Sequence, residues 1–204
     1  MVDKEKNKSV VNLCMEDTFD IEDLEGRRLY INDEIDESVI ESIVYQILRF
    51  NRQDKGKPKE DRVPIKLYIN SVGGSVVAGY GLIDAILTSK TPVYTINQAQ
   101  CASMGFLIFI SGDKRYSMPH AEFLMHDGDN FAYGSTAKMK DRMDFELGEL
   151  EEMHKAHILS HTKIDEDTYK EKYRIEWYFL PKVAKQYGVV DFIVGEDCDI
   201  DEII

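Results

Sequence analysis

Residues 65–87, IKLYINSVGGSVVAGYGLIDAIL, contain three successive patterns that together decide the fold class. Apolar residues at every second position over 65–69 predict a strand that stops at Asn70. The glycine-containing stretch 71–75 predicts a turn, and the apolar residues of 76–87 predict a helix. A strand, a turn and a helix in this order are the first part of a β–α–β unit, whose two strands run parallel.

The rest of the chain continues this alternation. Further strands are predicted at 29–31, 92–97, 115–118, 122–125 and 189–194, and further helices at about 36–48, 136–160 and 181–187. A polar loop is expected at 51–62. We therefore expect an α/β layered fold with parallel strands and helices on the outside.

Composition limits the classes of function. The 204 residues are 43% hydrophobic and 31% charged, which is typical of one globular domain with a buried core. The net charge of −13 argues against a nucleic-acid partner, because binding phosphates requires clustered Lys and Arg.

Three scattered cysteines, Cys14, Cys101 and Cys198, favour a reducing compartment over a disulfide framework. The first 20 residues lack the apolar core of a signal peptide. The longest apolar run, 106–110, is too short to span a membrane. We therefore expect a cytoplasmic protein that does not bind a membrane.

Residues 100–112, QCASMGFLIFISG, place one hydroxyl among small residues directly before an apolar run. Ser103 follows a predicted strand and precedes a predicted helix, a position that suits a nucleophile. The glycine turn at 73–74 also joins a strand to a helix, so its backbone N–H groups are free to point at a ligand. The amides of Gly74 and Met104 could together stabilise an oxyanion.

A serine nucleophile needs a general base, and His126 is the best candidate because it closes the predicted strand 122–125. His120, which follows Pro119, is interpreted as a turn residue. A single Ser and a single His are each more often structural than catalytic, so these residues alone leave both interpretations open.

Two other groups of residues could carry chemistry. His154, His157 and His161 share one helical face and could bind a metal, but a solvated face or packing between subunits is the simpler interpretation. Lys138 and Lys140 could serve a Ser–Lys dyad, but solvation explains them better because their predicted helix is rich in charge.

Three stretches, YINSVGGSVVAGYGLIDAI, CASMGFLIFISGDKRYSMPHAEFLMHDG and KQYGVVDFIV, resemble the peptidase subunit of the Clp protease, the ClpP family. The similarity extends from about Leu29 to Val194. It implies a serine endopeptidase of crotonase-like fold with a protruding long helix. It also implies heptameric rings stacked as a tetradecamer, which receive unfolded polypeptides from an AAA+ unfoldase. No cofactor or metal is implied, because only the unfoldase uses ATP.

The resemblance also implies roles for individual residues. It places the nucleophile at Ser103, the base at His126 and the oxyanion donors at Gly74 and Met104. The third member of the triad departs from the family, because alignment without gaps places Glu176 where an aspartate is usual.

Glutamate can orient an imidazole as aspartate does, so Glu176 is the expected acid. Asp165 and Asp167 lie a few residues upstream and are alternatives that no motif supports.

Other departures concern regulation and assembly more than chemistry. Val72 stands where the family has a proline, and the proline usual after the catalytic histidine is absent near His126. Residues 130–134 replace a Gln- and Gly-rich strand that links two rings, and the loop 51–62 is longer than usual. These departures indicate a divergent member, and an origin in a phage or another mobile element stays open.

The sequence is divided into a mobile N-terminal axial segment (1–25), a peptidase domain (26–195) and an acidic C-terminal tail (196–204). The apolar stripe of 39–48 is wider than one core contact requires, which favours a homo-oligomer. Two other functions stay open: a catalytically silent ring subunit, and a crotonase-fold enzyme acting on an acyl-CoA.

Overall fold

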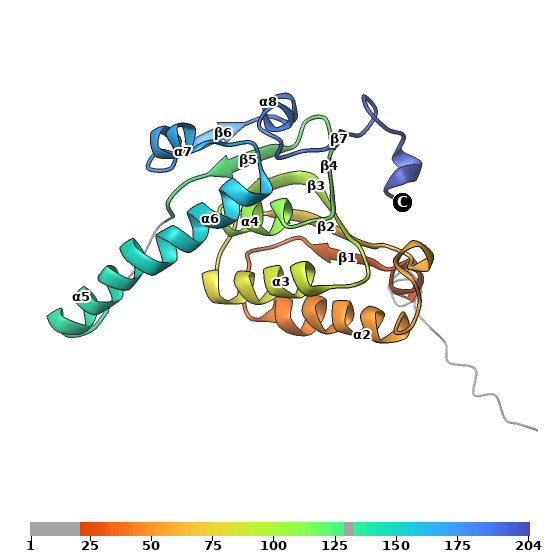
Figure 1. Cartoon of the computed structure of the whole chain (residues 1–204), viewed down its shortest axis with the longest axis horizontal. Coiled ribbons are helices and arrows are strands. Elements are labelled where there is room, and N and C mark those ends of the chain that lie inside the picture. The colour runs from red at the N-terminus through yellow and green to blue at the C-terminus, as the bar shows by residue number, and fades with distance from the viewer. Residues whose placement is uncertain (1–20, 129–132) are drawn as a thin grey trace, which may run out of the picture.

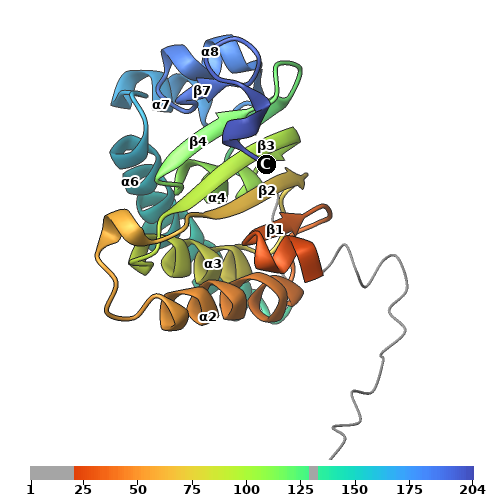
Figure 2. The same cartoon turned by 90° about the vertical axis from the view of Figure 1, so that its right-hand side faces the viewer.

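The structure, a computed structural model, describes residues 21–128 and 133–204. Within them, five strands form the main part of one sheet in the order β1-β2-β3-β4-β7, and each neighbouring pair is parallel (Figures 1 and 2). The strands are β1 (Arg28–Ile31), β2 (Ile65–Ser71), β3 (Val93–Ala102), β4 (Lys114–Ser117) and β7 (Phe192–Ile193). The expected α/β fold with a parallel sheet is confirmed.

The sheet forks along β3. Residues 94–97 pair with β4, whereas residues 100–102 pair in parallel with β5 (Glu122–Met125). β5 then pairs antiparallel with β6 (Trp177–Phe179), a strand that was not expected from the sequence. Because β3 and β5 are parallel neighbours, their carboxyl ends meet at the same edge of the sheet.

Helices that bury apolar side chains cover one face of the sheet. They are η1 (Ile40–Val44), which continues into α2 (Tyr45–Gln53), and then α3 (Val76–Thr88) and α4 (Met104–Ile110). Every residue of α4 is buried, because this helix packs against β3, α3 and α6. A helix made only of Met, Gly, Phe, Leu and Ile side chains has no polar face to expose, so its interior position follows from its sequence.

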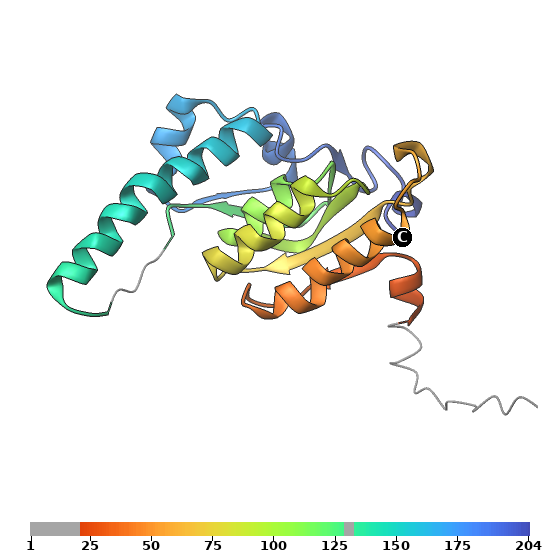
Figure 3. The same cartoon turned by 60° about the horizontal axis from the view of Figure 1, so that its bottom comes forward.

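A long helical rod protrudes from the domain, as Figures 1 and 3 show. It consists of α5 (Thr136–Phe145), the π-helical turn η3 (Glu146–Leu150) and α6 (Glu151–His161). The helix predicted at about 136–160 is therefore confirmed. Several apolar side chains of the rod are exposed: Met143, Phe145, Leu147 and Met153.

The C-terminal part folds back onto the sheet. It contains α7 (Glu166–Lys172), which was not expected, α8 (Pro181–Gln186) and the short η4 (Ile200–Glu202). Ile203 is buried in a cluster with Tyr68, Ile96 and Tyr116, and the Tyr68 hydroxyl donates to the Ile203 carbonyl. The acidic segment 196–204 is therefore packed against the domain.

The strand predicted at 189–194 is wrong over most of its length, since only Phe192 and Ile193 belong to β7. Val189 and Val190 are buried, but their amides donate to the Ala184 carbonyl of α8. Val189 and Val190 are apolar because they are buried against α8, and not because they belong to a strand.

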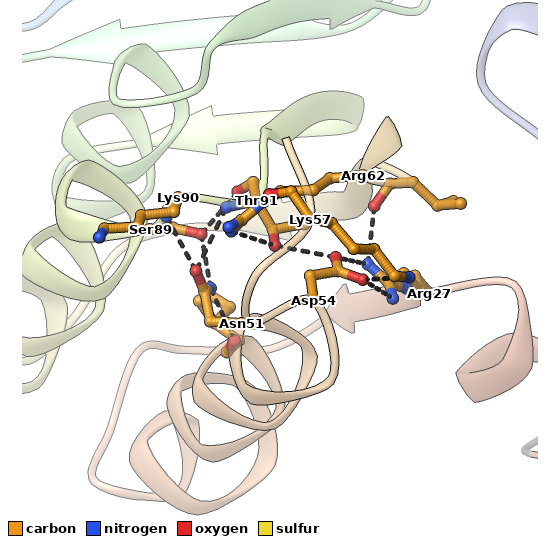
Figure 4. Close-up of polar contacts among 10 residues, drawn as sticks. Arg27, Asn51, Asp54, Lys57, Arg62, Ser89, Lys90 and Thr91 are labelled. Atoms are coloured by element: carbon orange, nitrogen blue, oxygen red, sulfur yellow. Dashed lines mark hydrogen bonds and ion pairs between the residues drawn. The ribbon is translucent and has the colours of Figure 1, made fainter. Parts of the chain in front are cut away.

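A buried ionic cluster closes the end of α2 (Figure 4). The Arg27 guanidinium donates to both carboxylate oxygens of Asp54, one of them at 2.9 Å, and Thr91 donates to Asp54 at 3.0 Å. Asp54 is fully buried, and the Arg27 hydrogen bonds hold the pKa of its carboxyl well below its usual range. The loop predicted at 51–62 starts later than expected, because Asn51 still belongs to α2 and accepts from the Lys90 amide.

Within the described residues, no helix has the length and apolar character that crossing a membrane requires.

Candidate active site

Ser103 lies between the end of β3 and the start of α4 in an uncommon backbone conformation. Its φ of 53° and ψ of −121° make it one of two non-glycine residues with positive φ in the described parts of the chain. Such a conformation costs about 1–3 kcal/mol and persists only where the surroundings enforce it. Here the Ser103 amide donates to the Leu124 carbonyl of β5 at 3.0 Å.

The Ser103 hydroxyl does not cap the helix that it precedes. A serine at this position usually accepts a hydrogen bond from the first turn, and that bond would explain its presence structurally. Here the hydroxyl has no hydrogen bond to any described residue, and Ser103 lines a cavity. The strained turn therefore presents the side chain without using it for helix stability.

Two glycines form the turn that contacts Ser103. Gly73 and Gly74 have φ of 104° and 141°, values that favour glycine. A Cβ on Gly73 would lie 2.6 Å from the Ser103 Cβ and 3.0 Å from the Met104 amide nitrogen, so this turn directly abuts the serine. The turn is held without a proline at Val72, because the Ser71 hydroxyl accepts from the Gly73 amide at 3.1 Å.

The amides of Gly74 and Met104 have no acceptor in the described protein. The bridge between Gly74 and Ile35 uses the neighbouring Gly73 carbonyl and Ser75 amide, which leaves the Gly74 N–H unused. Met104 is the first residue of α4, so its N–H has no partner within the helix. Both residues line the same cavity as Ser103, so two free donors border it.

His126 directly follows β5, as predicted, and is half-buried. Its Nε2 atom is buried and has no hydrogen-bond partner within the described residues. The ring lines the cavity that Ser103 lines. Because β3 and β5 are parallel neighbours, the residues that follow them, Ser103 and His126, leave the sheet on the same side.

The cavity encloses about 370 Å³. Its base comes from α4 and the end of β5, and one wall comes from the rod α5–η3–α6. The residues that the rod contributes are Met143, Glu146, Leu147, Leu150, Glu151, His154 and Ile158. A cleft of this volume with mainly apolar walls and a few converging polar groups is typical of a site for small ligands or peptide side chains.

The structure does not bring Glu176 into this cavity. Glu176 is exposed, and its Oε2 accepts from the Tyr178 hydroxyl at 3.3 Å. However, β5 and β6 pair Met125 with Trp177, and one further step in the same register would pair His126 with Glu176. Glu176 therefore lies at the end of the ladder that carries the histidine, with its carboxylate directed elsewhere.

The alternative acids also lie outside the cavity. Asp165 caps α7, because its carboxylate accepts from the Thr168 amide at 2.8 Å, and this bond lowers the pKa of Asp165. Asp167 is exposed in the first turn of the same helix. Neither residue lines the cavity.

Three acidic groups line the cavity that sequence reasoning did not assign: Asp127, Glu146 and Glu151. Of the three, Asp127 could most easily have been predicted from the sequence, since it directly follows the predicted base. Glu146 and Glu151 are brought in only by the docking of the rod, and no local pattern indicates that docking.

Two other groups were considered from the sequence: the lysines of a possible Ser–Lys dyad and the histidines of a possible metal site. Lys138 and Lys140 are exposed on α5, and Lys140 pairs with Asp144. His157 is buried and contacts the Ser111 hydroxyl at 3.0 Å, so a solvated face is the wrong interpretation for it. Burial lowers the pKa of His157 to about 4.

The domain combines a mainly parallel α/β sheet with one cavity that is lined by a strained serine, a histidine and two free amides. These features are typical of the class of proteins with a serine-hydrolase-like site. The sequence model of the Clp protease family matches residues 16–197, most of the chain. The chain belongs to the Clp protease (ClpP) family, as the three sequence stretches suggested. Members of this family are typically serine peptidases, and they generally form oligomeric chambers with AAA+ partners.

Proposed function

We propose that this chain is an active serine endopeptidase that cleaves unfolded polypeptides. The observation that carries the proposal is the convergence of Ser103, His126 and the free amides of Gly74 and Met104 on one cavity. A structural serine would not require a strained backbone and a hydroxyl without a capping bond.

The proposed reaction uses each group in turn. His126 takes the proton from the Ser103 hydroxyl as the oxygen attacks the peptide carbonyl. The Gly74 and Met104 amides stabilise the resulting oxyanion. His126 then gives its proton to the leaving amine, which leaves an acyl-enzyme. Water, activated by the same imidazole, releases the acid and restores the serine.

Glu176 is proposed to orient His126. Its backbone is one step beyond the Met125–Trp177 pair, so rotation of its side chain away from Tyr178 would direct the carboxylate toward the imidazole. A carboxylate in that position selects the tautomer of the base and stabilises the imidazolium.

The assembly proposed for this chain is a homo-oligomer of heptameric rings stacked as a tetradecamer in the cytoplasm, served by an AAA+ unfoldase. The exposed apolar side chains of the rod and Leu48 of α2 support association, because such surfaces are buried between subunits in oligomers. The proposed axial segment 1–25 lies mostly outside the described residues; residues 21–25 form a helical turn.

A serine-hydrolase probe with mass-spectrometric mapping tests the activity. Labelling is expected at Ser103 and is expected to disappear in Ser103→Ala and to fall strongly in His126→Ala. Both variants should lose hydrolysis of short fluorogenic peptides by several orders of magnitude while keeping the wild-type circular dichroism spectrum. Ser160→Ala, a change on the exposed side of α6, is the control that should leave labelling intact.

A second candidate is a catalytically silent ring subunit, which the position of Glu176 outside the cavity favours. Such a subunit would co-assemble with an active paralogue and would not be labelled. An acyl-CoA enzyme of crotonase type, which needs the paired amides but no serine, would retain its activity in Ser103→Ala.

A further inference from the structure

The cavity beside Ser103 contains a second imidazole, that of His154 on α6. Its Nε2 atom is buried and has no hydrogen-bond partner within residues 21–128 and 133–204. The ring is fixed in place, because it stacks on Tyr80 with 5.5 Å between ring centroids. A buried polar atom without a partner costs free energy, so this atom requires an explanation.

Apolar and acidic side chains share the cavity with His154. Leu150 and Ile158 lie one turn before and after it on the rod, and Phe106 and Leu107 line the cavity from α4. Burial lowers the pKa of His154, so its imidazole is neutral at neutral pH. The ring therefore supplies one uncharged hydrogen-bonding group beside these apolar side chains, in a cavity whose charged groups include Glu146 and Glu151.

This space lies next to the proposed nucleophile. Phe106 and Leu107 are three and four residues after Ser103, which places them one helical turn, about 5 Å, along α4. α6 is fixed to the same turn, because the His157 ring contacts the Leu107 carbonyl at 3.2 Å. A substrate side chain adjacent to a carbonyl held at Ser103 can therefore extend past Phe106 and Leu107 to His154.

We infer that His154 is a specificity-determining residue that selects peptides whose residue before the cleaved bond has an apolar body and an uncharged hydrogen-bonding tip, tyrosine above all. This inference rests on the proposed peptidase function. The tyrosine hydroxyl both donates and accepts, so it can pair with either tautomer of a neutral imidazole. A phenylalanine of the same shape leaves Nε2 unpaired, and an acidic side chain would be repelled by the carboxylates of Glu146 and Glu151.

The test compares two fluorogenic peptides that differ only in Tyr or Phe before the cleaved bond. For the wild-type protein we expect kcat/KM to favour the Tyr peptide by about tenfold or more, because one buried hydrogen bond separates the two substrates. His154→Leu should lower this ratio to one or below while the Phe peptide is still cleaved. His154→Gln, which keeps an uncharged hydrogen-bonding group, should restore part of the preference.

His120→Leu is the matched control, because it makes the same chemical change at an exposed turn outside the cavity and should leave the ratio unchanged. A Tyr-to-Phe ratio near one in the wild-type protein would overturn the inference, and so would an unchanged ratio in His154→Leu. If His154→Leu does not unfold cooperatively, the ratios of the wild type and His154→Gln decide the question.

Failure of the peptidase function is distinguishable from failure of this inference. If Ser103 is not labelled by a serine-hydrolase probe and neither peptide is cleaved, the proposed function is wrong and the inference is overturned with it. If Ser103 is labelled and both peptides are cleaved equally well, only the role of His154 is wrong.

Discussion

Met125 and Trp177 are antiparallel partners at the last pair of the β5–β6 ladder. His126 and Glu176 are the next residues on these two strands, so the proposed base and acid emerge from one ladder end. A ladder fixes the separation of two backbones more firmly than a loop does. The remaining freedom belongs to the Glu176 side chain, whose carboxylate accepts from Tyr178.

Replacing Glu176 tests whether this carboxylate serves His126. Glu176→Gln should lower kcat by about 100-fold or more, because the amide cannot select the correct tautomer of the imidazole. Glu176→Asp should retain measurable activity, since the charge is kept and only the reach changes. Steady-state hydrolysis of a fluorogenic peptide gives both values. Wild-type rates for Glu176→Gln, with loss in Asp165→Asn or Asp167→Asn, would reassign the role.

The strained backbone at Ser103 is expected to lower the stability of the fold unless position 103 is glycine. Ser103→Gly should abolish hydrolysis and yet unfold with a free energy about 1 kcal/mol above that of Ser103→Ala, because glycine adopts positive φ without penalty. Urea denaturation of the two inactive variants measures the difference. An Ala variant as stable as the Gly variant would show that the backbone is not strained.

The contact between Gly73 and Ser103 predicts that a single methyl group disables the site. Gly73→Ala should reduce activity by at least about tenfold and lower thermal stability, because its Cβ would lie 2.6 Å from the Ser103 Cβ. Gly56→Ala is the matched control: it also has positive φ but nothing within 4 Å of the added Cβ. Equal losses of activity in the two variants would contradict the proposed steric cause.

The Arg27–Asp54 pair predicts a pH-dependent stability. Asp54→Asn should destabilise the fold by about 3 kcal/mol at pH 7, because it leaves a buried guanidinium without its counter-charge. The folded-state pKa of Asp54 is below its unfolded value of about 3.9, so the carboxylate contributes stability above that value. This contribution is lost as the pH falls toward the folded-state pKa.

Chemical denaturation at several pH values checks this expectation. The difference in unfolding free energy between the wild type and Asp54→Asn should shrink on acidification below about pH 4. Asp61→Asn, an exposed site nearby in the chain, should show no such difference at any pH. A constant difference for Asp54→Asn across the series would exclude the ionised carboxylate as its cause.

Assembly is tested by size exclusion with multi-angle light scattering. A single chain has a mass of 23.5 kDa, and we expect particles of seven or fourteen chains. Replacing exposed apolar residues of the rod, for example Phe145→Ser, should weaken the association without unfolding the subunit. A wild-type protein that stays monomeric at micromolar concentration would rule the ring out.

The sequence predicted the parts of this fold that local patterns determine. The alternation over 65–69, the glycine turn and the helix after it are encoded within a few residues, and so is the placement of Ser103 between a strand and a helix. β6 was missed because a three-residue strand has no period of its own and exists through pairing with β5. Residues 189–190 were assigned to a strand because burial against α8 and burial in a sheet give the same apolar run.

The candidate site also contains residues that local motifs locate and residues that only long-range packing positions. Motifs in the sequence locate the serine, the histidine and the glycine turn, because each lies at a junction of predicted elements. The position of His154 and of the acidic groups on the rod depends on how a distant helix docks against α4. That docking is a long-range relationship, and a single sequence contains no local record of it.

The π-helical turn η3 sets the rotational phase between the two halves of the rod. One extra residue in a turn offsets the following helix by about 100° relative to a continuous α-helix. The side chains before the turn, such as Met143, and those after it, such as His154, face the same cavity with this offset in place. If the same residues formed an uninterrupted α-helix, one half of the rod would turn by this angle relative to the other, and its side chains would leave the cavity. The hydrogen-bonding pattern of a five-residue segment thus determines which side chains border the cavity.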